Sequence, residues 1–357
     1  MPPEMLRPET ESDLSAIIRT APAPLTSIGG GTRLQPGEGQ GARLTTAALT
    51  GVTLYEPAAL TLVARAGTPL AEIEALLASE GQRLPFEPPA RAGSTIGGVT
   101  AANASGPRRV KDGAARDSLI GVRFVDGAGE IIKNGGRVMK NVTGYDLVKL
   151  MAGSRGRLGV LTEVAYKTQP IPPAVVTLTL PGLTAARAIP PLTAALTGPW
   201  DVSGAGWLPD MGAMIRIEGL AGSVKLRTET LSHRLAAWGE VLTLDAAPWH
   251  LLSANIPGSG AAPRSDADLW RILCRPSQAA QILATLPAPP LALDWGGSLI
   301  WADLPAVTVP QLPGHAQATR MTGRDPLHLP PPQPAIAALN DGLRAQFDPR
   351  GIFARGA

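Results

Sequence analysis

Three glycine-rich segments carry the clearest chemical signal in the sequence. They are the Gly-Gly-Gly-Thr run at residues 29–32, the stretch from Gly97-Gly98 to Asn103, and the run GSRGRLG at residues 153–159. Because glycine has no Cβ, main-chain N–H groups there can turn toward a ligand and approach it closely. One such cluster is equally well explained as a structural turn. Three clusters, each next to an apolar β-type run, predict a backbone folded around a long cofactor that carries a diphosphate.

The two commonest nucleotide-binding motifs are missing. A Rossmann fold has G-x-G-x-x-G between a strand and a helix, but residues 32–37 (TRLQPG) offer no helix. The Walker loop needs Gly-Lys-Ser or Gly-Lys-Thr, and neither tripeptide occurs in the chain. The sequence therefore argues against both of these binding modes.

Length and composition fit a globular protein of two or more lobes. The chain has 357 residues, and its 40 glycines and 36 prolines predict many turns. The formal charge is only +3 and the arginines are scattered, so nucleic-acid binding is not supported. The densest basic patch is residues 108–111 (Arg-Arg-Val-Lys) with Arg116. It is interpreted as a solvated loop, or as a site for an anionic cofactor, an acidic substrate or a partner protein.

Cysteine usage limits the redox chemistry of the chain. Cys274 is the only cysteine, which excludes an internal disulfide and a self-contained iron–sulfur cluster, since a cluster needs about four thiolates. Any such cluster must belong to another subunit, and Cys274 is interpreted as structural. The first residues lack the pattern of a signal peptide, and no run approaches the ~18 apolar residues of a membrane span. We expect a cytoplasmic protein with membrane contact only through partners.

Apolar periodicity predicts an α+β chain with a domain boundary at the proline run of residues 169–173. Before it we expect helices at 10–19 and 69–81, strands at 25–28, 52–55, 60–66 and 158–168, and a hairpin at 122–133. The second helix is predicted to have Thr68 as its N-cap and Pro69 at its first position. Residues 92–106 are small and polar without helical period, so they are predicted to form a loop.

After the boundary, strands and helices follow the βαββαβ order of a ferredoxin-like lobe between residues 175 and 238. A second set follows, with strands at 269–274, 291–294 and 298–302 and a helix at 278–286, and a last helix is predicted at 336–347. All seven tryptophans of the chain fall in this part, and we predict for six of them that they pack in its core rather than at a subunit interface. They are Trp207, Trp238, Trp249, Trp270, Trp295 and Trp301.

Four segments resemble flavoproteins of the vanillyl-alcohol oxidase and p-cresol methylhydroxylase (PCMH) type. They are SIGGGTRL at 27–34, STIGGVTAANASGPRR at 94–109, VMKNVTGYDLVKLMAGSRGRLGVLTEV at 138–164 and FDPRGIF at 347–353. The resemblance implies an α+β protein with a two-lobed PCMH-type FAD-binding domain at 1–170, a ferredoxin-like α+β cap at 174–330, and a tail at 331–357 that returns to the FAD domain.

The same resemblance implies which residues bind FAD. The pyrophosphate is assigned to Ile28, Gly29, Gly30, Gly31 and Thr32. The flavin and ribityl chain are assigned to Thr95, Gly97, Gly98, Asn103 and Gly106. Further contacts are assigned to Ser154, Gly156 and Gly159, and the adenine or ribose to Leu161 with Thr162.

Two departures from the family pattern concern histidine. His233, His250, His315 and His328 all lie beyond residue 170, so a covalent histidine link to FAD in the first lobe is excluded and FAD is expected to be non-covalent. The cap also lacks the histidine-rich metal and substrate motif of the 2-hydroxy-acid dehydrogenases, so no metal site is expected.

The resemblance further implies a role in oxidising glycolate, a 2-hydroxy acid, to glyoxylate. Such a reaction needs a base for the hydroxyl proton and a cation for the carboxylate. The candidate cations are Arg109, Lys140, Arg320 and Arg324, with Tyr145 and Asp146 nearby in the Gly-Tyr-Asp-Leu segment, and the catalytic residues stay unassigned.

Because the cap lacks the histidine motif, we expect an FAD-bearing subunit that accepts or relays electrons. Its partners would be a catalytic FAD-containing glycolate oxidase subunit and an iron–sulfur subunit. The alternatives are an independent FAD oxidase or dehydrogenase of another small alcohol or acid, and a non-catalytic assembly subunit.

Overall fold

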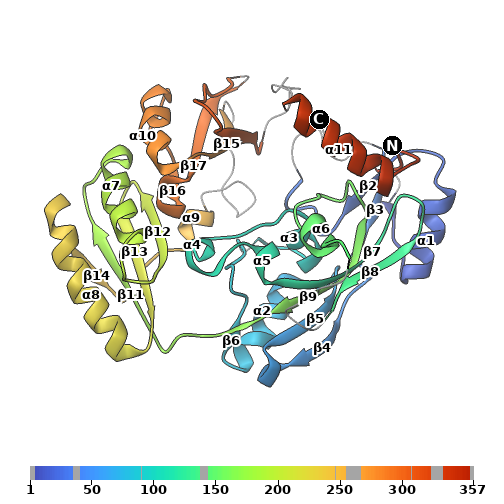
Figure 1. Cartoon of the computed structure of the whole chain (residues 1–357), viewed down its shortest axis with the longest axis horizontal. Coiled ribbons are helices and arrows are strands. Elements are labelled where there is room, and N and C mark those ends of the chain that lie inside the picture. Colours follow the sequence, from blue (N-terminus) through green and yellow to red (C-terminus); the bar gives the residue numbers. More distant parts are fainter. Residues whose placement is uncertain are drawn as a thin grey trace. The chain divides into compact units, whose positions relative to one another are not determined.

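The computed structural model describes residues 5–34, 41–89, 91–136, 144–245, 247–254, 267–306, 308–322 and 333–353 (Figure 1). The chain divides into two compact units. The first contains Met1–Ala104, Ala114–Pro170 and His328–Ala357, and the second contains Ser105–Gly113 and Ile171–Leu327. Residues 105–113, which the sequence interpretation assigns to the first domain, therefore belong to the second unit.

A three-stranded parallel sheet opens the first unit. Its spatial order is β1 (Met5–Leu6), β3 (Ala42–Thr45) and β2 (Leu25–Ile28), with helix α1 (Glu11–Thr20) between β1 and β2 in sequence. The Thr10 hydroxyl accepts a hydrogen bond from the Asp13 N–H, and the Asp13 carboxylate accepts one from the Thr10 N–H, which closes a capping box. Leu14 and Ile18 are fully buried. The helix predicted at 10–19 is thus confirmed, with its apolar stripe in the core.

A five-stranded antiparallel sheet forms the second layer of this unit. Its order is β4 (Val52–Glu56), β5 (Thr61–Arg65), β9 (Val160–Lys167), β7 (Leu119–Val125) and β8 (Ile131–Gly135). The pairing of β7 with β8 confirms the predicted hairpin. Helices α2 (Leu70–Ser79), α3 (Ile96–Ala101), α5 (Ala115–Ser118) and α6 (Leu147–Met151) share one core cluster with Phe124 and Tyr166 of the sheet. Smaller elements are η1 (Pro57–Ala59) and the pair β6 (Gln82–Arg83) with β10 (Gln169–Pro170).

Two sequence predictions in this unit are wrong. Residues 92–106 are not simply a loop, because α3 forms within them: Thr95 caps it through the Gly98 N–H, and Ile96 and Val99 are fully buried. Packing and the cap outweigh the poor helix propensity of its glycines. The N-cap of α2 is Pro69 rather than Thr68. The Thr68 hydroxyl donates instead to the Arg65 carbonyl oxygen at 2.7 Å.

The C-terminal segment completes the first unit. Helix α11 (Pro334–Phe347) packs Leu343 and Phe347 against the core of the five-stranded sheet. Phe353 then pairs with Leu25 as a parallel bridge beside β2. The guanidinium of Arg350 donates to the carbonyl oxygens of Ile18, Arg19 and Ala21 at 2.7–3.1 Å, at the C-terminal end of α1. A cation at this position also complements the helix dipole.

The second unit is built on an eight-stranded antiparallel sheet. Its first half runs β11 (Ala174–Leu180), α7 (Ala185–Leu196), β12 (Val202–Leu208), β13 (Gly212–Gly219), α8 (Ala221–Leu235), η2 (Ala236–Trp238) and β14 (Leu242–Leu244), and the strands lie in the order β14-β11-β13-β12. This is the order of a ferredoxin-like fold. The predicted βαββαβ pattern is therefore confirmed.

The second half of the sheet repeats this arrangement without the second helix among the described residues. It runs β15 (Ala267–Leu273), α10 (Pro276–Thr285), β16 (Ala292–Asp294), η3 (Trp295–Gly297), β17 (Leu299–Pro305) and β18 (Gln317–Arg320), with strand order β16-β17-β15-β18. The halves join where Trp207 of β12 pairs with Leu293 of β16. Two short helices, α4 (Arg109–Asp112) and α9 (Leu251–Ala254), also belong to this unit.

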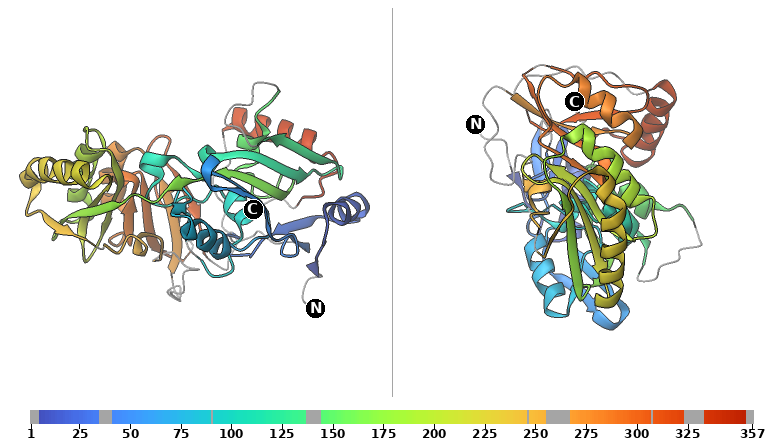
Figure 2. Two further views of the ribbon diagram at one scale, coloured as in Figure 1. Left: turned by 90° about the horizontal axis from the view of Figure 1, so that it is seen from below. Right: turned by 90° about the vertical axis from the view of Figure 1, so that its left-hand side faces the viewer.

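The two faces of this sheet carry separate cores. Helices α7, α8 and α10 cover one face with an aliphatic cluster (Figure 2). The other face carries an aromatic cluster with Trp249, Trp295 and Trp301. Five of the six tryptophans considered are less than a tenth exposed and Trp238 packs against the aliphatic core, which confirms their predicted core role. Within the described residues, none of the helices combines the length and apolar character that a bilayer crossing requires.

We expect Arg350→Ala to destabilise the first unit by about 1–2 kcal/mol, because three carbonyl oxygens at the end of α1 lose a charged donor. The measurement is urea unfolding, followed by circular dichroism. Arg187→Ala, at an exposed position of α7, is the matched control and should leave the midpoint unchanged. Equal midpoints for both variants would contradict this role of Arg350.

Candidate functional site

A pocket that is partly open to solvent lies in the first unit. Residues from all three glycine-rich segments line it. The lining residues expected from the sequence are Ile28, Gly29, Gly30, Gly31, Thr32, Thr95, Gly97, Gly98, Gly156, Gly159 and Leu161. The fold thus brings segments that are up to ~130 positions apart to one cavity.

The first wall is the loop that follows β2. A Cβ on Gly30 would lie 1.6 Å from the carbonyl oxygen of Gly93, and Gly31 has a φ of +70°, so both positions require glycine. Within the described part of the chain, the main-chain N–H groups of residues 29–32 donate to no protein acceptor. A loop with several unbonded N–H groups beside a cavity is the arrangement that binds phosphate oxygens.

The second wall is the first turn of α3. The Gly97 N–H donates to the Ala66 carbonyl oxygen at 2.8 Å, and the Ile96 N–H donates to the Thr68 carbonyl oxygen at 3.0 Å. A Cβ on Gly97 would lie 2.6 Å from the Cβ of Ala66. The N–H groups of this turn are therefore already bonded, and the turn contributes a closely packed wall rather than anion donors.

Four residues expected to contact the cofactor do not line the pocket. Asn103 accepts a hydrogen bond from the Arg116 N–H at 3.0 Å and so holds the start of α5. Gly106 lies in the second unit, where its carbonyl oxygen accepts from Trp295 Nε1 at 3.0 Å. The Ser154 hydroxyl is buried without a partner among the described residues. Thr162, expected near the adenine or ribose, also lies outside this lining.

Several lining residues were not assigned a role from the sequence. They are Ser27, Arg33, Leu34, Thr46, Ala66, Ala101 and Ala102. Arg155 also lines the pocket and lies in the segment 154–159, for which backbone contacts were expected. Thr46 and Ala66, which follow β3 and β5, lie outside the four segments that carry the resemblance. Only the pairing of strands could show that the ends of β3 and β5 meet the loop after β2.

Two of the candidate cations for a substrate carboxylate, Arg109 and Arg320, lie within the described residues, and neither lines this pocket. Arg109 stacks over the Trp295 ring at 4.5 Å, and Arg320 forms a buried ion pair with Asp268 at 2.8 Å. Lys140 and Arg324 lie outside the described residues. The Tyr145 side chain is 88% exposed, and Asp146 caps α6 by accepting from the Lys149 N–H.

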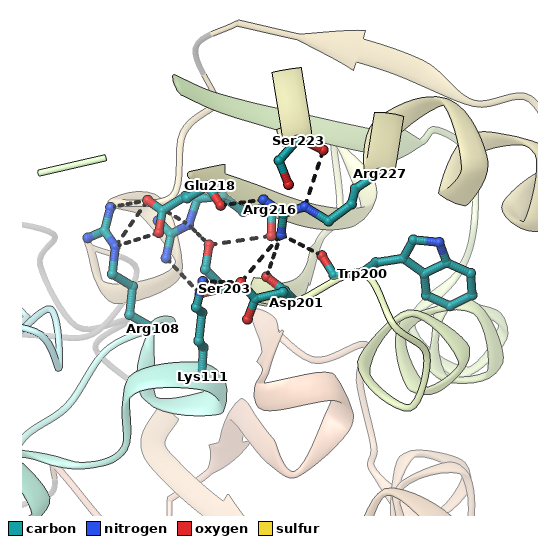
Figure 3. A network of polar contacts seen from close by, with 9 residues as sticks. All are labelled: Arg108, Lys111, Trp200, Asp201, Ser203, Arg216, Glu218, Ser223 and Arg227. Atoms are coloured by element: carbon teal, nitrogen blue, oxygen red, sulfur yellow. Dashed lines mark hydrogen bonds and ion pairs between the residues drawn. The ribbon is translucent and has the colours of Figure 1, made fainter. Parts of the chain in front are cut away.

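The basic patch at 108–111 belongs to the second unit, and its Arg108 and Lys111 take part in a network of polar contacts there (Figure 3). The Arg108 guanidinium binds the Glu218 carboxylate through Nε and Nη2, with a shortest distance of 2.7 Å. Glu218 is 2% exposed and lies 3.8 Å from the guanidinium of Arg216, which bonds Ser203. One carboxylate therefore stands between two guanidinium groups, and the solvated-loop reading of Arg108 is wrong.

A second, more exposed set of bonds extends this network. Asp201 accepts from Lys111 Nζ at 2.6 Å and from Arg227 Nη1 at 3.4 Å (Figure 3). Arg227 also donates to the carbonyl oxygens of Trp200 and Glu218. Both ends of α4 are thereby tied to the sheet of the second unit.

Comparison with known proteins shows the family of the chain and its cofactor. The FAD binding domain family matches residues 2–135. The glycolate oxidase subunit GlcE of Escherichia coli (strain K12) is 37% identical over 313 residues, which covers 86% of this chain and 84% of that protein. The chain belongs to the GlcE family of FAD-binding subunits. It is an FAD-dependent oxidoreductase, and FAD is its cofactor.

Two further comparisons extend this result. The glycolate oxidase subunit GlcD of Bacillus subtilis (strain 168) is 33% identical over 185 residues, covering 50% of this chain and 39% of that protein. A crystal structure of alkyldihydroxyacetonephosphate synthase covers 98% of this chain and 76% of its own chain, with 14% identity and a TM-score of 0.67. This similarity supports the fold, an α+β protein with a PCMH-type FAD-binding domain.

The pocket residues fit FAD. The loop at 29–32 offers N–H groups for the diphosphate, and a Cβ on Gly29, Gly30 or Gly97 would meet neighbouring atoms within 2.6 Å, so the cradle depends on glycine. When bound, FAD would accept a hydride or electrons. The described residues contain no group of three His, Cys, Asp or Glu side chains that could hold a metal ion.

We expect Gly30→Ala to abolish FAD binding, because the new methyl group overlaps the Gly93 carbonyl oxygen and must displace the loop. The measurement is the ratio of flavin to protein absorbance after purification. Gly222→Ala is the control: its Cβ meets nothing within 4 Å in α8, so it should keep full flavin content with about 0.5–1 kcal/mol more stability. A Gly30→Ala variant with full flavin would contradict the close approach.

We expect Glu218→Gln to destabilise the second unit by about 3 kcal/mol, because it removes the carboxylate that stands between the buried Arg216 and Arg108. Arg108→Gln should cost less, about 1–2 kcal/mol, because Glu218 keeps Arg216 as a neighbour. Lys111→Gln, which breaks a more exposed pair, should cost under about 1 kcal/mol. Urea unfolding of the three variants checks this order, and a reversed order would contradict the network.

Proposed function

We propose that the chain is the FAD-binding subunit of a glycolate oxidase or dehydrogenase complex that converts glycolate to glyoxylate. The observation that supports this most is the 37% identity to GlcE over 86% of the chain, which spans both units. The GlcE name identifies that protein as a subunit of glycolate oxidase. A shared substrate and a shared complex are the simplest consequences of such extended similarity.

In this proposal the chain binds FAD non-covalently and accepts or relays electrons. Within the described part of the chain, the pocket-lining residues with ionisable side chains are Arg33 and Arg155. Guanidinium groups stay charged at neutral pH and do not take a proton from a hydroxyl group. The base for the 2-hydroxy acid is therefore assigned to a catalytic partner subunit, which also contains FAD.

The second proposed partner is an iron–sulfur subunit. Cys274 is the only cysteine of the chain, and its Sγ lies 3.4 Å from the Gly297 carbonyl oxygen. Burial raises the pKa of this thiol to about 11, so it is protonated at neutral pH and is a poor metal ligand. Electrons leaving FAD toward a cluster must consequently pass to another chain.

Two other functions make different predictions. An independent FAD oxidase or dehydrogenase of another small alcohol or acid would reduce its own flavin with that substrate. A non-catalytic assembly subunit would support complex formation without useful flavin chemistry. The intact glycine loop, with its unbonded N–H groups beside the pocket, favours a chain that binds FAD over the assembly role.

The test is the visible spectrum of the purified chain before and after acid precipitation, followed by anaerobic addition of glycolate. We expect flavin bands that acid releases, since no histidine or cysteine lies within residues 1–170, and a flavin that glycolate alone leaves oxidised. Adding the purified catalytic and iron–sulfur subunits should then allow glycolate to reduce it.

Each other outcome has a defined meaning. Bleaching by glycolate without partners would overturn the relay role and make this chain the substrate-oxidising subunit. Flavin that stays in the acid precipitate would overturn non-covalent binding. A flavin that remains oxidised even with both partners would overturn the assignment to a glycolate oxidase complex.

A further inference from the structure

Three arginines form hydrogen bonds at the loop of residues 29–34, either to the loop itself or from it to neighbouring segments. Arg33 Nη1 donates to Ser94 Oγ at 2.7 Å and to Thr32 Oγ1 at 3.1 Å, and Arg33 Nη2 donates to the Pro89 carbonyl oxygen at 2.8 Å. Arg91 and Arg155 each donate, at 2.7 Å, to the carbonyl oxygens of Thr32 and Arg33 respectively. The loop at 29–34 is therefore held by guanidinium groups that approach it from two other segments of the first unit.

Two of these guanidinium groups have no compensating carboxylate in the part of the chain that the structure describes. Among the described residues, no Asp or Glu oxygen lies within ion-pair distance of Arg33 or Arg91. Burial, together with the charge of Arg91, lowers the pKa of Arg33 to about 10. Burial also lowers the pKa of Arg91, whose Nε is buried without a partner. Burying two guanidinium groups of like charge costs free energy unless a nearby negative charge offsets it.

Glu74, the acid whose charge acts on Arg33, does little to offset this positive charge. Burial raises the pKa of the Glu74 carboxyl group, and the attraction of Arg33 only partly opposes that effect. On Arg33 itself, the attraction of Glu74 is the smallest of the three influences on its pKa. The positive charge beside the loop therefore stays largely uncompensated within the described residues.

This charge lies at the pocket. Arg33 is one of its lining residues, and so are Gly29, Gly30, Gly31 and Thr32, whose N–H groups have no protein acceptor among the described residues. A diphosphate placed against those N–H groups would bring negative charge next to Arg33 and, behind it, Arg91. The cost of burying the two cations would then be offset by the ligand, as is common for arginine at phosphate sites.

A purely structural role explains part of the same geometry. The bonds from Arg33 to Ser94 and to the Pro89 carbonyl oxygen join two pocket-lining loops, and a neutral donor could also make them. A neutral tether would not make ligand affinity depend on salt. The dependence of ligand affinity on ionic strength therefore distinguishes an electrostatic role of Arg33 from a purely structural one.

We propose that Arg33, supported by Arg91, is a positioning residue that makes this loop selective for a diphosphate. Arg33 holds the hydroxyls of Thr32 and Ser94 together, and its charge favours an anion on the loop N–H groups. Arg91 fixes the Thr32 carbonyl oxygen and adds a second positive charge. The inference rests on FAD as the cofactor and assigns no catalytic step to either arginine.

The test measures FAD affinity of the full-length chain after its flavin has been removed. Titrations at ionic strengths from about 0.05 to 0.5 M compare the wild type with Arg33→Gln, Arg33→Lys and Arg187→Gln. Arg187 is an exposed arginine of α7 in the second unit, so its variant is the matched control for loss of one positive charge. Thermal unfolding of each flavin-free variant reports its folding separately.

We expect wild-type affinity to fall as salt rises. Arg33→Gln should weaken FAD binding at low salt by roughly tenfold or more and flatten the salt dependence. Arg33→Lys should keep the salt dependence and lose part of the affinity, because lysine keeps the charge but not the planar fork. Arg187→Gln should match the wild type. An Arg33→Gln variant with wild-type salt dependence, or a wild type insensitive to salt, would overturn the proposal.

A second measurement covers the case in which Arg33→Gln does not fold. Inorganic pyrophosphate is titrated against wild-type chain that is half-saturated with FAD, and inorganic phosphate at twice the concentration is the comparison. Displacement of FAD by pyrophosphate, but not by phosphate, is the expected result. Absence of displacement would overturn selectivity for a diphosphate. Failure of the wild type to bind FAD would instead contradict the cofactor assignment, so the two failures are distinct.

Discussion

At Gly30 the main chain passes so close to the Gly93 carbonyl oxygen that a Cβ would lie 1.6 Å from it. This approach brings the loop after β2 against the residues that lead into α3. The same crowding leaves the N–H groups of residues 29–32 without a protein acceptor in the described part of the chain. The pocket exists because two backbone segments touch without side chains between them. The surrounding arginines and the packing of α3 all depend on that contact.

The second unit depends on a different constraint, the burial of charge. Glu218 is 2% exposed and Arg216 is also 2% exposed, so neither could stay ionised at reasonable cost alone. Arg108 supplies a second cation from residues 105–113, a segment that leaves the first unit and returns to it. One buried carboxylate thereby holds this nine-residue segment in the second unit. The aromatic cluster strengthens this attachment through Arg109 over Trp295.

Much of this architecture could be predicted from local sequence signals. Helix α1 has a capping box and a clear apolar stripe, and the hairpin of β7 and β8 has a turn sequence, so both were predicted correctly. The glycine clusters identified most of the pocket. Helix α3 was missed because its stability comes from Ile96 and Val99 packing on the sheet, which local propensity does not contain. The pairing of Arg108 with Glu218 joins residues 110 positions apart, so no local pattern could indicate it.

The path of the chain between the two units has a consequence for its synthesis. Residues 105–113 and 171–327 fold in one unit, while the residues before, between and after them fold in the other. The bond from Arg350 to the Ala21 carbonyl oxygen joins positions 329 apart, and Phe353 pairs with Leu25. During translation, the N-terminal sheet can therefore be completed only after these C-terminal residues have been synthesised, while the ferredoxin-like halves leave the ribosome earlier. The unit that binds the cofactor is the last to be completed.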